Sequence, residues 1–331
     1  MQFIQKVKQT IIKHHMLSFG DKVLIAVSGG PDSIVLLYSL KLLQDFFGLK
    51  LYIAHLDHML RRDSFQDLVF VKGIANNLNI PIKVKRINIK KFASKGSLEE
   101  IARNIRLDFL INTAKAIKAD KIALGHTKDD QAETVLMRII RGCGLYGLCS
   151  IFPVRNIRGF TLIRPLIETE RKDIEIFLKK LKIKPRRDAT NNQVKFFRNK
   201  IRNKLLPIIK KEYNPQIKQA LVNLAKISAQ DYDLIEYLGQ NSLKKCKLRL
   251  SKKILSLDLN KFLKLHKGLQ RMVFRLAIER LIGTTRRFTF KHWQEIEDLI
   301  YESHSGSILN LPRQISVSKL RDRIVLTLRN P

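Results

Sequence analysis

Residues 23–37, VLIAVSGGPDSIVLL, decide the fold of this chain. The apolar, β-branched run that ends at Val27 predicts a buried strand, and the apolar run that follows Ser33 continues at helical spacing. A short glycine loop separates the two runs, so the stretch predicts a strand, a loop and a helix in that order. In this geometry the backbone N–H groups of the loop and the N-terminus of the helix point at one spot. The stretch therefore predicts a binding site for a phosphate or pyrophosphate group.

The chemistry of the loop residues suits this task. Two glycines allow close approach to the backbone, two serines add hydroxyl donors, and a proline fits the first helical turn, where no N–H is needed. The candidate nucleotide-binding residues of the loop are Ser28, Gly29, Gly30, Pro31, Asp32 and Ser33. The loop has neither the Gly-Lys-Ser/Thr of a Walker A loop nor the Gly-x-Gly-x-x-Gly of a dinucleotide-binding fold.

Asp32 is an unusual residue to find beside a phosphate, because both groups carry negative charge. A carboxylate at this position is explained if it holds a Mg²⁺ that bridges the phosphates, or if it orients a nucleophile. The alternative is that Asp32 and Ser33 only cap the helix. We take Asp32 as a candidate catalytic residue and as the candidate Mg²⁺ ligand.

The composition predicts a polyanionic partner. The chain has 331 residues, with 63 Lys and Arg against 29 Asp and Glu, so its formal net charge is +34. A charge of this size favours nucleic acid as the partner, with an anionic membrane surface second. No apolar run reaches the ~18 residues of a membrane span, so no membrane insertion is expected.

The three cysteines, Cys143, Cys149 and Cys246, form no Cys-x-x-Cys pair. This spacing argues against a zinc ribbon, an iron–sulfur site and a disulfide framework. It fits a reducing compartment, the cytoplasm or the stroma or matrix of an organelle. The basic, amphipathic residues 1–15 could imitate a transit peptide, but they contain no arginine, which favours a first helix that packs beside the sheet.

Polar side chains follow two further predicted strands, 51–55 and 121–125, at their carboxyl ends. The first cluster comprises His55, Asp57, His58 and Arg61. The second begins at His126. In an open α/β sheet, ligands bind at the carboxyl ends of the strands, so His55 and His126 are candidate nucleotide-binding residues. A metal site at the first cluster and a merely solvated turn are the alternatives.

The second cluster also carries two acids, Asp130 and Glu133, which lie on one face of a predicted helix. With Asp32 they could hold Mg²⁺ and accept an ammonium group, whereas the alternative is a capped helix with exposed acids. Arg106 lies on the predicted helix 97–117, close to Arg103. It is either a functional cation or a member of a surface ion-pair ladder.

The alternation of strands and helices predicts a parallel sheet with right-handed crossovers, in which residues 82–87 form an exposed edge strand. Lys and Arg interleave with phenylalanine over 182–212, which suits phosphate contacts and stacking on unpaired RNA bases. A long helix from residue 217 predicts an arm that leads to a small α+β domain. Further helices are expected at 64–78, 170–182, 266–281 and 290–301, strands at 307–309, 314–317 and 323–328, and a glycine-rich mobile loop within 138–148.

The loop resembles the signature of the N-type ATP pyrophosphatase, or PP-loop, superfamily, whose enzymes use ATP to adenylate an oxygen and release pyrophosphate. The full set of motifs resembles one family within it, the tRNA(Ile)-lysidine synthetases, which are lysine–cytidine ligases. The resembling segments are 28–33, 55–61, 99–106, 126–134, 141–144, 164–166 and 198–202. The tail 305–328 looks like the family's first C-terminal domain, and no counterpart of the further domain of longer members is expected.

The resemblance implies a Rossmann-like PP-loop ATPase domain, 1–212, and a helical linker with an α+β tRNA-binding domain, 213–331. It also implies a two-step reaction. ATP adenylates the C2 oxygen of the wobble cytidine in a CAU anticodon, and the ε-amine of free L-lysine then displaces AMP to give lysidine, which changes codon reading from AUG to AUA. The partners are tRNA(Ile) and lysine, and a homodimer is a candidate assembly.

The resemblance further implies roles for five candidate catalytic residues. The loop would hold the pyrophosphate, with Mg²⁺ on Asp32. Asp130 and Glu133, together with Asp32, would bind the lysine ammonium group and help to deprotonate it. Arg106 and Arg202 would contact nucleotide or phosphate.

Three other classes of protein remain as alternatives. A PP-loop tRNA thiolase would share the fold and the basic surface, but it would want paired reactive or cluster-binding cysteines, which Cys143 and Cys149 supply poorly. A small-molecule amidotransferase or an NAD- or GMP-type synthetase would share the loop without needing a charge of +34. A non-enzymatic RNA-binding module would explain the charge but not the carboxylates at the strand ends.

Overall fold

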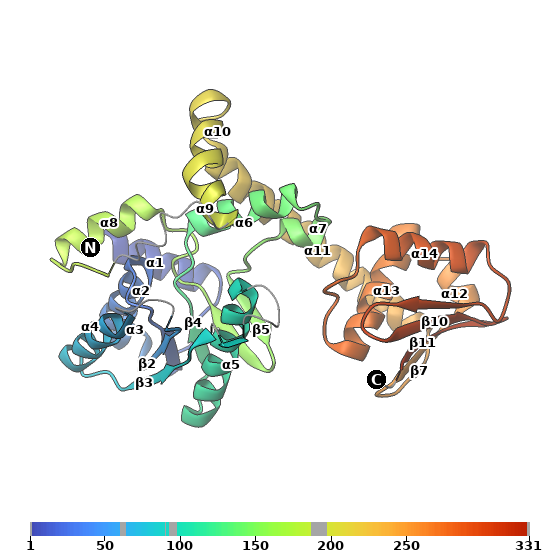
Figure 1. Cartoon of the computed structure of the whole chain (residues 1–331), viewed down its shortest axis with the longest axis horizontal. Coiled ribbons are helices and arrows are strands. Elements are labelled where there is room, and N and C mark those ends of the chain that lie inside the picture. Colours follow the sequence, from blue (N-terminus) through green and yellow to red (C-terminus); the bar gives the residue numbers. More distant parts are fainter. Residues whose placement is uncertain (1, 60–63, 90, 93–97, 187–196, 330–331) are drawn as a thin grey trace. The chain divides into compact units, whose positions relative to one another are not determined.

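The computed structural model describes the chain except for residues 1, 60–63, 90, 93–97, 187–196 and 330–331 and the side chains of residues 98 and 99. Residue contacts divide the chain into two compact units, 1–227 and 228–331 (Figure 1). The division falls inside α11 (Ile217–Cys246), whose first turns pack on unit 1 and whose later turns pack on unit 2. The functional boundary at 212/213 stays a prediction. The expectations for Arg61, for the start of the helix at 97 and for residues 187–196 lie outside the described residues.

Unit 1 is built on a six-stranded sheet with the order β3-β2-β1-β4-β6-β5. The strands are β1 (Lys22–Ala26), β2 (Lys50–Asp57), β3 (Ile82–Arg86), β4 (Lys121–Ala123), β5 (Val154–Ile157) and β6 (Phe160–Ile163). All the described neighbours pair in parallel except β5 and β6. The predicted α/β fold is confirmed, and β3 is an edge strand, as expected. The β5–β6 hairpin was not predicted, because its strands are only four residues long and include the polar pair Arg155 and Asn156.

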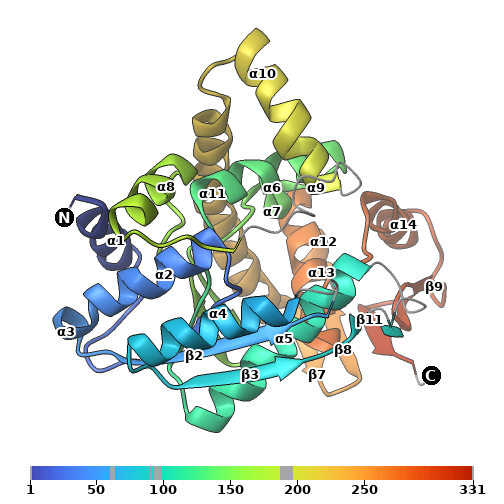
Figure 2. The ribbon, with the colours of Figure 1, turned by 60° about the vertical axis from the view of Figure 1, so that its left-hand side comes forward.

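Helices cover both faces of this sheet (Figures 1 and 2). One face packs against α1 (Gln2–Lys13), α2 (Pro31–Leu42), α3 (Gln44–Phe47), α4 (Ser64–Asn77) and α8 (Arg171–Lys180), and the other against α5 (Leu98–Ile117). Side chains alternate along β1, so that Val23 and Ile25 enter the first core and Leu24 enters the second. Because both faces are packed, the backbone is held firmly where the strands end.

A separate helical cluster follows the fourth strand of the sheet. It comprises α6 (Lys128–Ile140), α7 (Leu145–Leu148), α9 (Phe197–Lys200), a π-helix (Ile201–Leu205), α10 (Leu206–Glu212) and the first turns of α11. Val135, Ile201, Leu206 and Leu221 share its apolar core. The π-helix joins α9 to α10 through one wide turn. The prediction of a glycine-rich loop within 138–148 is wrong in one respect, because this segment contains the helical turn α7.

Unit 2 is an α+β domain, as expected. Its antiparallel sheet has the order β7-β8-β11-β10-β9. The elements are β7 (Lys247–Leu250), β8 (Ile254–Asp258), α12 (Leu259–Leu263), α13 (Lys267–Ile282), α14 (Phe290–Tyr301), β9 (Ile308–Leu311), β10 (Ile315–Lys319) and β11 (Arg323–Leu328). Phe262, Phe274 and Trp293 pack edge to face in its core. Among the described helices of the chain, none is long and apolar enough to cross a lipid bilayer.

Gly239 allows α11 and α13 to approach closely within unit 2. A Cβ atom at this position would lie 2.3 Å from Cγ of Met272, whereas a Cβ atom at Gly73 of α4 would meet open space. We expect Gly239→Ala to lower the free energy of unfolding by about 1–3 kcal/mol through overpacking. Gly73→Ala should raise it by about 0.5–1 kcal/mol through helix propensity. Urea unfolding of both variants measures the difference, and shifts of the same sign would contradict the close helix contact.

Candidate active site

Hydrogen bonds between its own residues fix the conformation of the loop 28–33. The backbone N–H of Ser28 donates to Oγ of Ser33 at 3.1 Å, and that hydroxyl donates to the carbonyl of Gly30 at 2.9 Å. Gly29 has a φ of +91°, which an L side chain rarely adopts. Gly30 is the N-cap of α2 and no side chain caps the helix, so the alternative of an Asp-Ser cap is wrong. The N-terminus of α2 is therefore left free to face a ligand.

The end of β4 packs directly against this loop. A Cβ atom at Gly125 would lie 3.1 Å from the carbonyl oxygen of Asp32 and 3.3 Å from the backbone nitrogen of Ser33. These neighbours are backbone atoms, which cannot rotate away as a side chain can. Gly125 therefore sets the distance between the carboxyl end of β4 and the first turn of α2.

We expect Gly125→Ala to displace the first turn of α2 by a few tenths of an ångström. Since a misplacement of about 1 Å can cost a hundredfold in rate, kcat/KM for ATP should fall by about tenfold. Steady-state kinetics with varied ATP measure this effect. Gly73→Ala is the control, because a Cβ atom there meets nothing. An unchanged kcat/KM in Gly125→Ala would show that the loop does not need this spacing.

A cavity of about 400 Å³ lies at the carboxyl ends of β1, β2 and β4. It is lined by Ala26, Val27, Ser28, Gly30, Pro31, Asp32, Ser33, Ala54, Leu56, His58, Arg106, Phe109, Leu110, Leu124, Gly125, His126, Asp130, Arg171, Arg198 and Arg202. We call it the strand-end cavity. Most of the predicted site residues line it, whereas Gly29, His55 and Glu133 do not. One part of its wall is apolar and the rest carries the loop, the acids and four arginines.

Asp32 lies in this cavity, and its buried Oδ1 atom has no hydrogen-bond partner in the part of the chain that the structure describes. Burial, followed by the negative charge of Asp130, raises the pKa of Asp32 to about 6. The positive charges of Arg171 and Arg202 oppose this rise but do not cancel it. A buried carboxylate oxygen with no donor is costly, so this atom is suited to a cation brought by a ligand.

Three histidines near the cavity are held neutral. Burial lowers the pKa of His126 to about 3, assisted by the charge of Arg164, and burial also lowers the pKa values of His55 and His58. Nδ1 of His55 donates to the carbonyl of Val27 at 2.9 Å, which leaves its Nε2 as an acceptor. Nε2 of His55 and Nδ1 of both other rings are buried without a partner among the described residues. These rings do not form a shared metal site with Asp57, which instead accepts from Nε of Arg86 at 2.9 Å.

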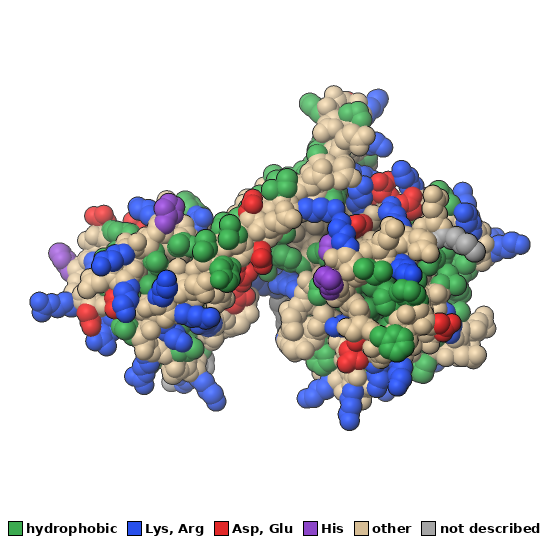
Figure 3. Space-filling view, turned by 180° about the vertical axis from the view of Figure 1, so that it is seen from behind, with side chains coloured by type: hydrophobic (Ala, Val, Ile, Leu, Met, Phe, Trp, Pro, Cys, Tyr) green, Lys and Arg blue, Asp and Glu red, His purple; other side chains and the backbone are tan. Residues whose placement is uncertain are grey.

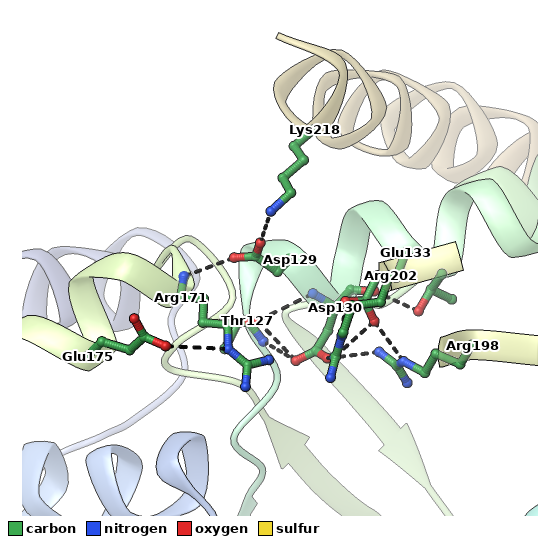
Figure 4. A network of polar contacts seen from close by, with 10 residues as sticks. Thr127, Asp129, Asp130, Glu133, Arg171, Glu175, Arg198, Arg202 and Lys218 are labelled. Atoms are coloured by element: carbon green, nitrogen blue, oxygen red, sulfur yellow. Dashed lines mark hydrogen bonds and ion pairs between the residues drawn. The ribbon is translucent and has the colours of Figure 1, made fainter. Parts of the chain in front are cut away.

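Asp130 and Glu133 form a compact network with two arginines from the segment after the undescribed stretch (Figure 4). Arg198 donates through Nε to Glu133 and through a terminal nitrogen to Asp130, both at 2.8 Å. Arg202 donates to both oxygens of Glu133, at 2.5 and 3.0 Å. Oδ2 of Asp130 also accepts from the backbone and the hydroxyl of Thr127, in a capping box that starts α6.

This network changes what the two acids can do. Both carboxylates are buried, and Glu133 is only 2% exposed. Burial is the largest single influence on Asp130 and would raise its pKa. The charges of Arg198 and Arg202 and the hydrogen bond from the Thr127 backbone are among the influences that together outweigh it, so the pKa is lowered and the acid is ionised. The acids therefore hold the guanidinium groups of Arg198 and Arg202 at the cavity wall. Their predicted contact with an ammonium group stays a prediction.

Arg106 lines the same cavity from α5. Among the described residues it makes no hydrogen bond and no ion pair, so it is not part of a surface ladder. Three polar lining residues, His58, Arg171 and Arg198, were not among the candidate site residues, although His58 belonged to the first predicted cluster and Arg198 to a resembling segment. Arg198 had a signal, because it lies four positions before Arg202 and so on the same helical face. Arg171 had none, because it is simply the first residue of a basic helix.

Comparison with known proteins identifies the family. A model of the PP-loop domain matches residues 1–209, and a model of the TilS substrate binding domain matches residues 257–324. The chain is 36% identical over 325 residues to the tRNA(Ile)-lysidine synthase of Clostridioides difficile, covering 97% of this chain and 70% of that protein. It is 37% identical over 323 residues to the enzyme of the same name from Clostridium acetobutylicum, covering 94% and 67%. The chain belongs to the tRNA(Ile)-lysidine synthase family.

A solved structure outside the tRNA(Ile)-lysidine synthase family shares the fold. The U34-tRNA thiolase NcsA from Methanococcus maripaludis with its [4Fe-4S] cluster aligns with a TM-score of 0.56 and 19% identity, over 68% of this chain and 79% of that chain. In this member of the tRNA(Ile)-lysidine synthase family the three cysteines are free, and Cys149 and Cys246 are buried. Cys143 packs tightly against Gly147. A Cβ atom added to Gly147 would lie 2.5 Å from the Cβ atom of Cys143.

Proposed function

We propose that loop 28–33 of this ATP-dependent ligase holds the triphosphate of ATP while the wobble cytidine of tRNA(Ile) enters the strand-end cavity. One observation carries the proposal. The free N-terminus of α2, an unpartnered oxygen of Asp32 and the guanidinium groups of Arg106, Arg198 and Arg202 line a single cavity. Such a cavity suits a polyanion that arrives with its own cation.

In the first step the C2 oxygen of the cytidine attacks the α-phosphorus of ATP. The bond from that phosphorus to the bridging oxygen breaks, and pyrophosphate leaves with the electron pair. The loop amides and the N-terminus of α2 stabilise the charge on the leaving group. Arg106 and Arg202 stabilise the charge on the α-phosphate. The apolar wall formed by Ala54, Leu56 and Phe109 takes the adenine base.

Asp32 fits a Mg²⁺ ion, because its buried Oδ1 atom has no partner among the described residues. Mg²⁺ in nucleotide sites is commonly held by one or two carboxylates and the phosphates. When bound, the ion neutralises phosphate charge. His58 and His126, which also line the cavity, are neutral and add no positive charge to it. They can only offer ring nitrogens as acceptors or donors to the nucleotide.

In the second step the ε-amine of free L-lysine attacks C2 of the adenylated cytidine. The bond from C2 to its oxygen breaks, AMP leaves with that oxygen, and the amine loses a proton. Asp32, with a pKa of about 6, is ionised at neutral pH, and its carboxylate receives this proton through the oxygen that does not hold the ion. Asp130 and Glu133 contribute by fixing the two arginines, and their negative charge attracts the lysine ammonium group.

The surface of the chain supports tRNA as the partner. Lys and Arg side chains spread over the visible face of each unit, with far fewer Asp and Glu (Figure 3). This is the distribution expected for phosphate contacts over a wide area. We propose a cytoplasmic enzyme whose C-terminal residues 213–331 bind tRNA. The homodimer stays a candidate, which analytical ultracentrifugation would test.

The direct test mixes the protein with ATP, radiolabelled lysine and an unmodified tRNA that has a CAU anticodon. We expect label to enter the tRNA(Ile) only when ATP is present, and the methionine tRNA with the same anticodon to remain unlabelled. Pyrophosphate should appear with tRNA(Ile) and not with lysine alone. Label in both tRNAs would contradict the proposed specificity, and label in neither would contradict the reaction.

The thiolase alternative makes a different prediction for the cysteines. A thiolase would need a reactive pair, whereas a lysine ligase would not. We expect Cys143→Ser combined with Cys149→Ser to keep lysidine formation within about twofold of wild type, because small residues of similar size fill both positions. The labelled-lysine assay measures this, with thermal unfolding as the check on folding. Loss of activity in a folded double variant would favour a thiol-dependent reaction.

A further inference from the structure

Arg171 occupies a special place at the strand-end cavity. It is the first residue of α8, which packs beside α2, and it lines the cavity together with Ser28, Gly30 and Asp32. Its backbone nitrogen donates to Oδ2 of Asp129 at 2.9 Å. Asp129 lies in the first turn of α6 and also binds Lys218 of α11. The main chain of Arg171 is therefore fixed beside the network that holds Asp130.

The side chain of Arg171, in contrast, has little to hold it. Its partner among the described residues is Glu175, at 3.9 Å from Nε, and the two side chains are 43% and 54% exposed (Figure 4). An exposed pair at this distance contributes little to stability. Arg198 and Arg202 differ, because Glu133 holds each of them at 3.0 Å or less. Arg171 thus combines a fixed backbone with a guanidinium group that can exchange Glu175 for a better anion.

The positive charge of Arg171 lowers the pKa of Asp32, which lines the same cavity. It is the strongest of the positive charges that lower the pKa of Asp32, although burial and Asp130 prevail. Asp32 lies in the first turn of α2, next to the N–H groups that face the proposed phosphates. Because Arg171 and Asp32 line the same cavity, a ligand held beside Asp32 shares that cavity with the guanidinium group.

We propose that Arg171 is a further catalytic residue, which binds the pyrophosphate leaving group from α8 while loop 28–33 binds it from α2. When the bond from the α-phosphorus to the bridging oxygen breaks, the electron pair passes to the pyrophosphate. An arginine can meet this growing charge with two parallel hydrogen bonds. The inference rests on the proposed position of the triphosphate, and it adds a residue that this proposed mechanism does not use.

Arg171→Met tests this inference, because it removes the charge and keeps much of the length. The full chain is assayed with tRNA(Ile) for ATP–pyrophosphate exchange, and inorganic pyrophosphate is used as a product inhibitor. We expect exchange to fall by about 10- to 100-fold and the inhibition constant of pyrophosphate to rise by about tenfold. The KM for lysine should stay within about twofold, because the lost contact is to the leaving group. Arg171→Lys should recover part of the loss.

Lys172→Met is the matched control, since it removes one positive charge from the next residue, which is 73% exposed and outside the cavity. Glu175→Gln, which removes the present partner of Arg171, should leave pyrophosphate inhibition equal or stronger. If Arg171→Met behaves like Lys172→Met, or if its defect appears only in the KM for lysine, the inference is overturned. Ser33→Ala separates this failure from that of the proposed function. If neither Ser33→Ala nor Arg171→Met weakens pyrophosphate inhibition, the triphosphate does not lie in the loop.

Discussion

Replacing Asp32 with Asn is expected to abolish adenylation and at the same time to stabilise the fold. The activity depends on an ionised carboxylate, so kcat/KM for adenylation should fall by about 10²- to 10⁴-fold. The stability depends on the opposite form. The pKa of Asp32 rises from 3.8 to about 6 on folding, because burial disfavours the charged form. At pH 8 the neutral Asn should therefore raise the free energy of unfolding by about 3 kcal/mol.

The pH dependence distinguishes this explanation from a general repair of packing. The raised pKa means that the folded state binds the Asp32 proton more tightly than the unfolded state does. The wild type therefore loses stability between about pH 4 and pH 6 as this group ionises, and the loss stays constant above. The advantage of Asp32→Asn should be full at pH 8 and absent at pH 4. Kinetics of the wild type should rise through about pH 6 and then level off. A variant that is inactive but no more stable at pH 8 would contradict an unpartnered ionised Asp32.

Replacing Glu133 with Gln is expected to produce the largest loss of stability. This acid is 2% exposed and binds both Arg198 and Arg202, so the change removes one carboxylate from the network and leaves the two guanidinium groups to share Asp130. Removing one member of a buried ionic network typically costs about 3–5 kcal/mol. The arginines would also lose their fixed positions at the cavity, so adenylation should fall together with stability. Urea unfolding and ATP–pyrophosphate exchange measure the two effects.

Glu175→Gln is the control for this change, because it removes an exposed acid from a pair at 3.9 Å and should shift stability by less than about 1 kcal/mol. Adding Arg202→Gln to Glu133→Gln should cost less than the sum of the two single changes, since the double variant no longer buries the unpaired charge. If Glu133→Gln raises only the KM for lysine and leaves unfolding unchanged, Glu133 is a lysine-binding group and does not serve to hold the arginines.

The elements that the sequence predicted well are those with strong local periodicity. Strand β1, the loop and α2 follow from one apolar pattern with a glycine break, and α11 follows from a long helical repeat. The strands β5, β6, β7 and β8 were missed because they gain their stability from pairing and lack a strong local pattern of their own. Such pairing depends on neighbours that are distant along the chain.

Contacts between residues that are distant along the chain also limited the prediction of single site residues. The loop and the acids at the strand ends could be placed from sequence, because parallel strands bring their carboxyl ends to one edge. The partners of the acids could not be placed, since Arg198 and Arg202 are 65 and 69 residues from Glu133. Whether an acid is free to bind a ligand depends on such long-range partners, and a helical pattern says nothing about them.

The π-helix at Ile201–Leu205 makes this region tolerant of one change in length. A π turn contains one residue more than an α turn, so deleting a residue there would close it into a regular helix. The wide turn takes up its extra residue without turning the helix that follows, so Leu206 would keep its place in the apolar core that it shares with Val135. A deletion in a regular helix would instead rotate everything after it by about 100°, which is one step of an α-helix. Related enzymes should accordingly accept a shortened turn here far better than a deletion in the neighbouring helices.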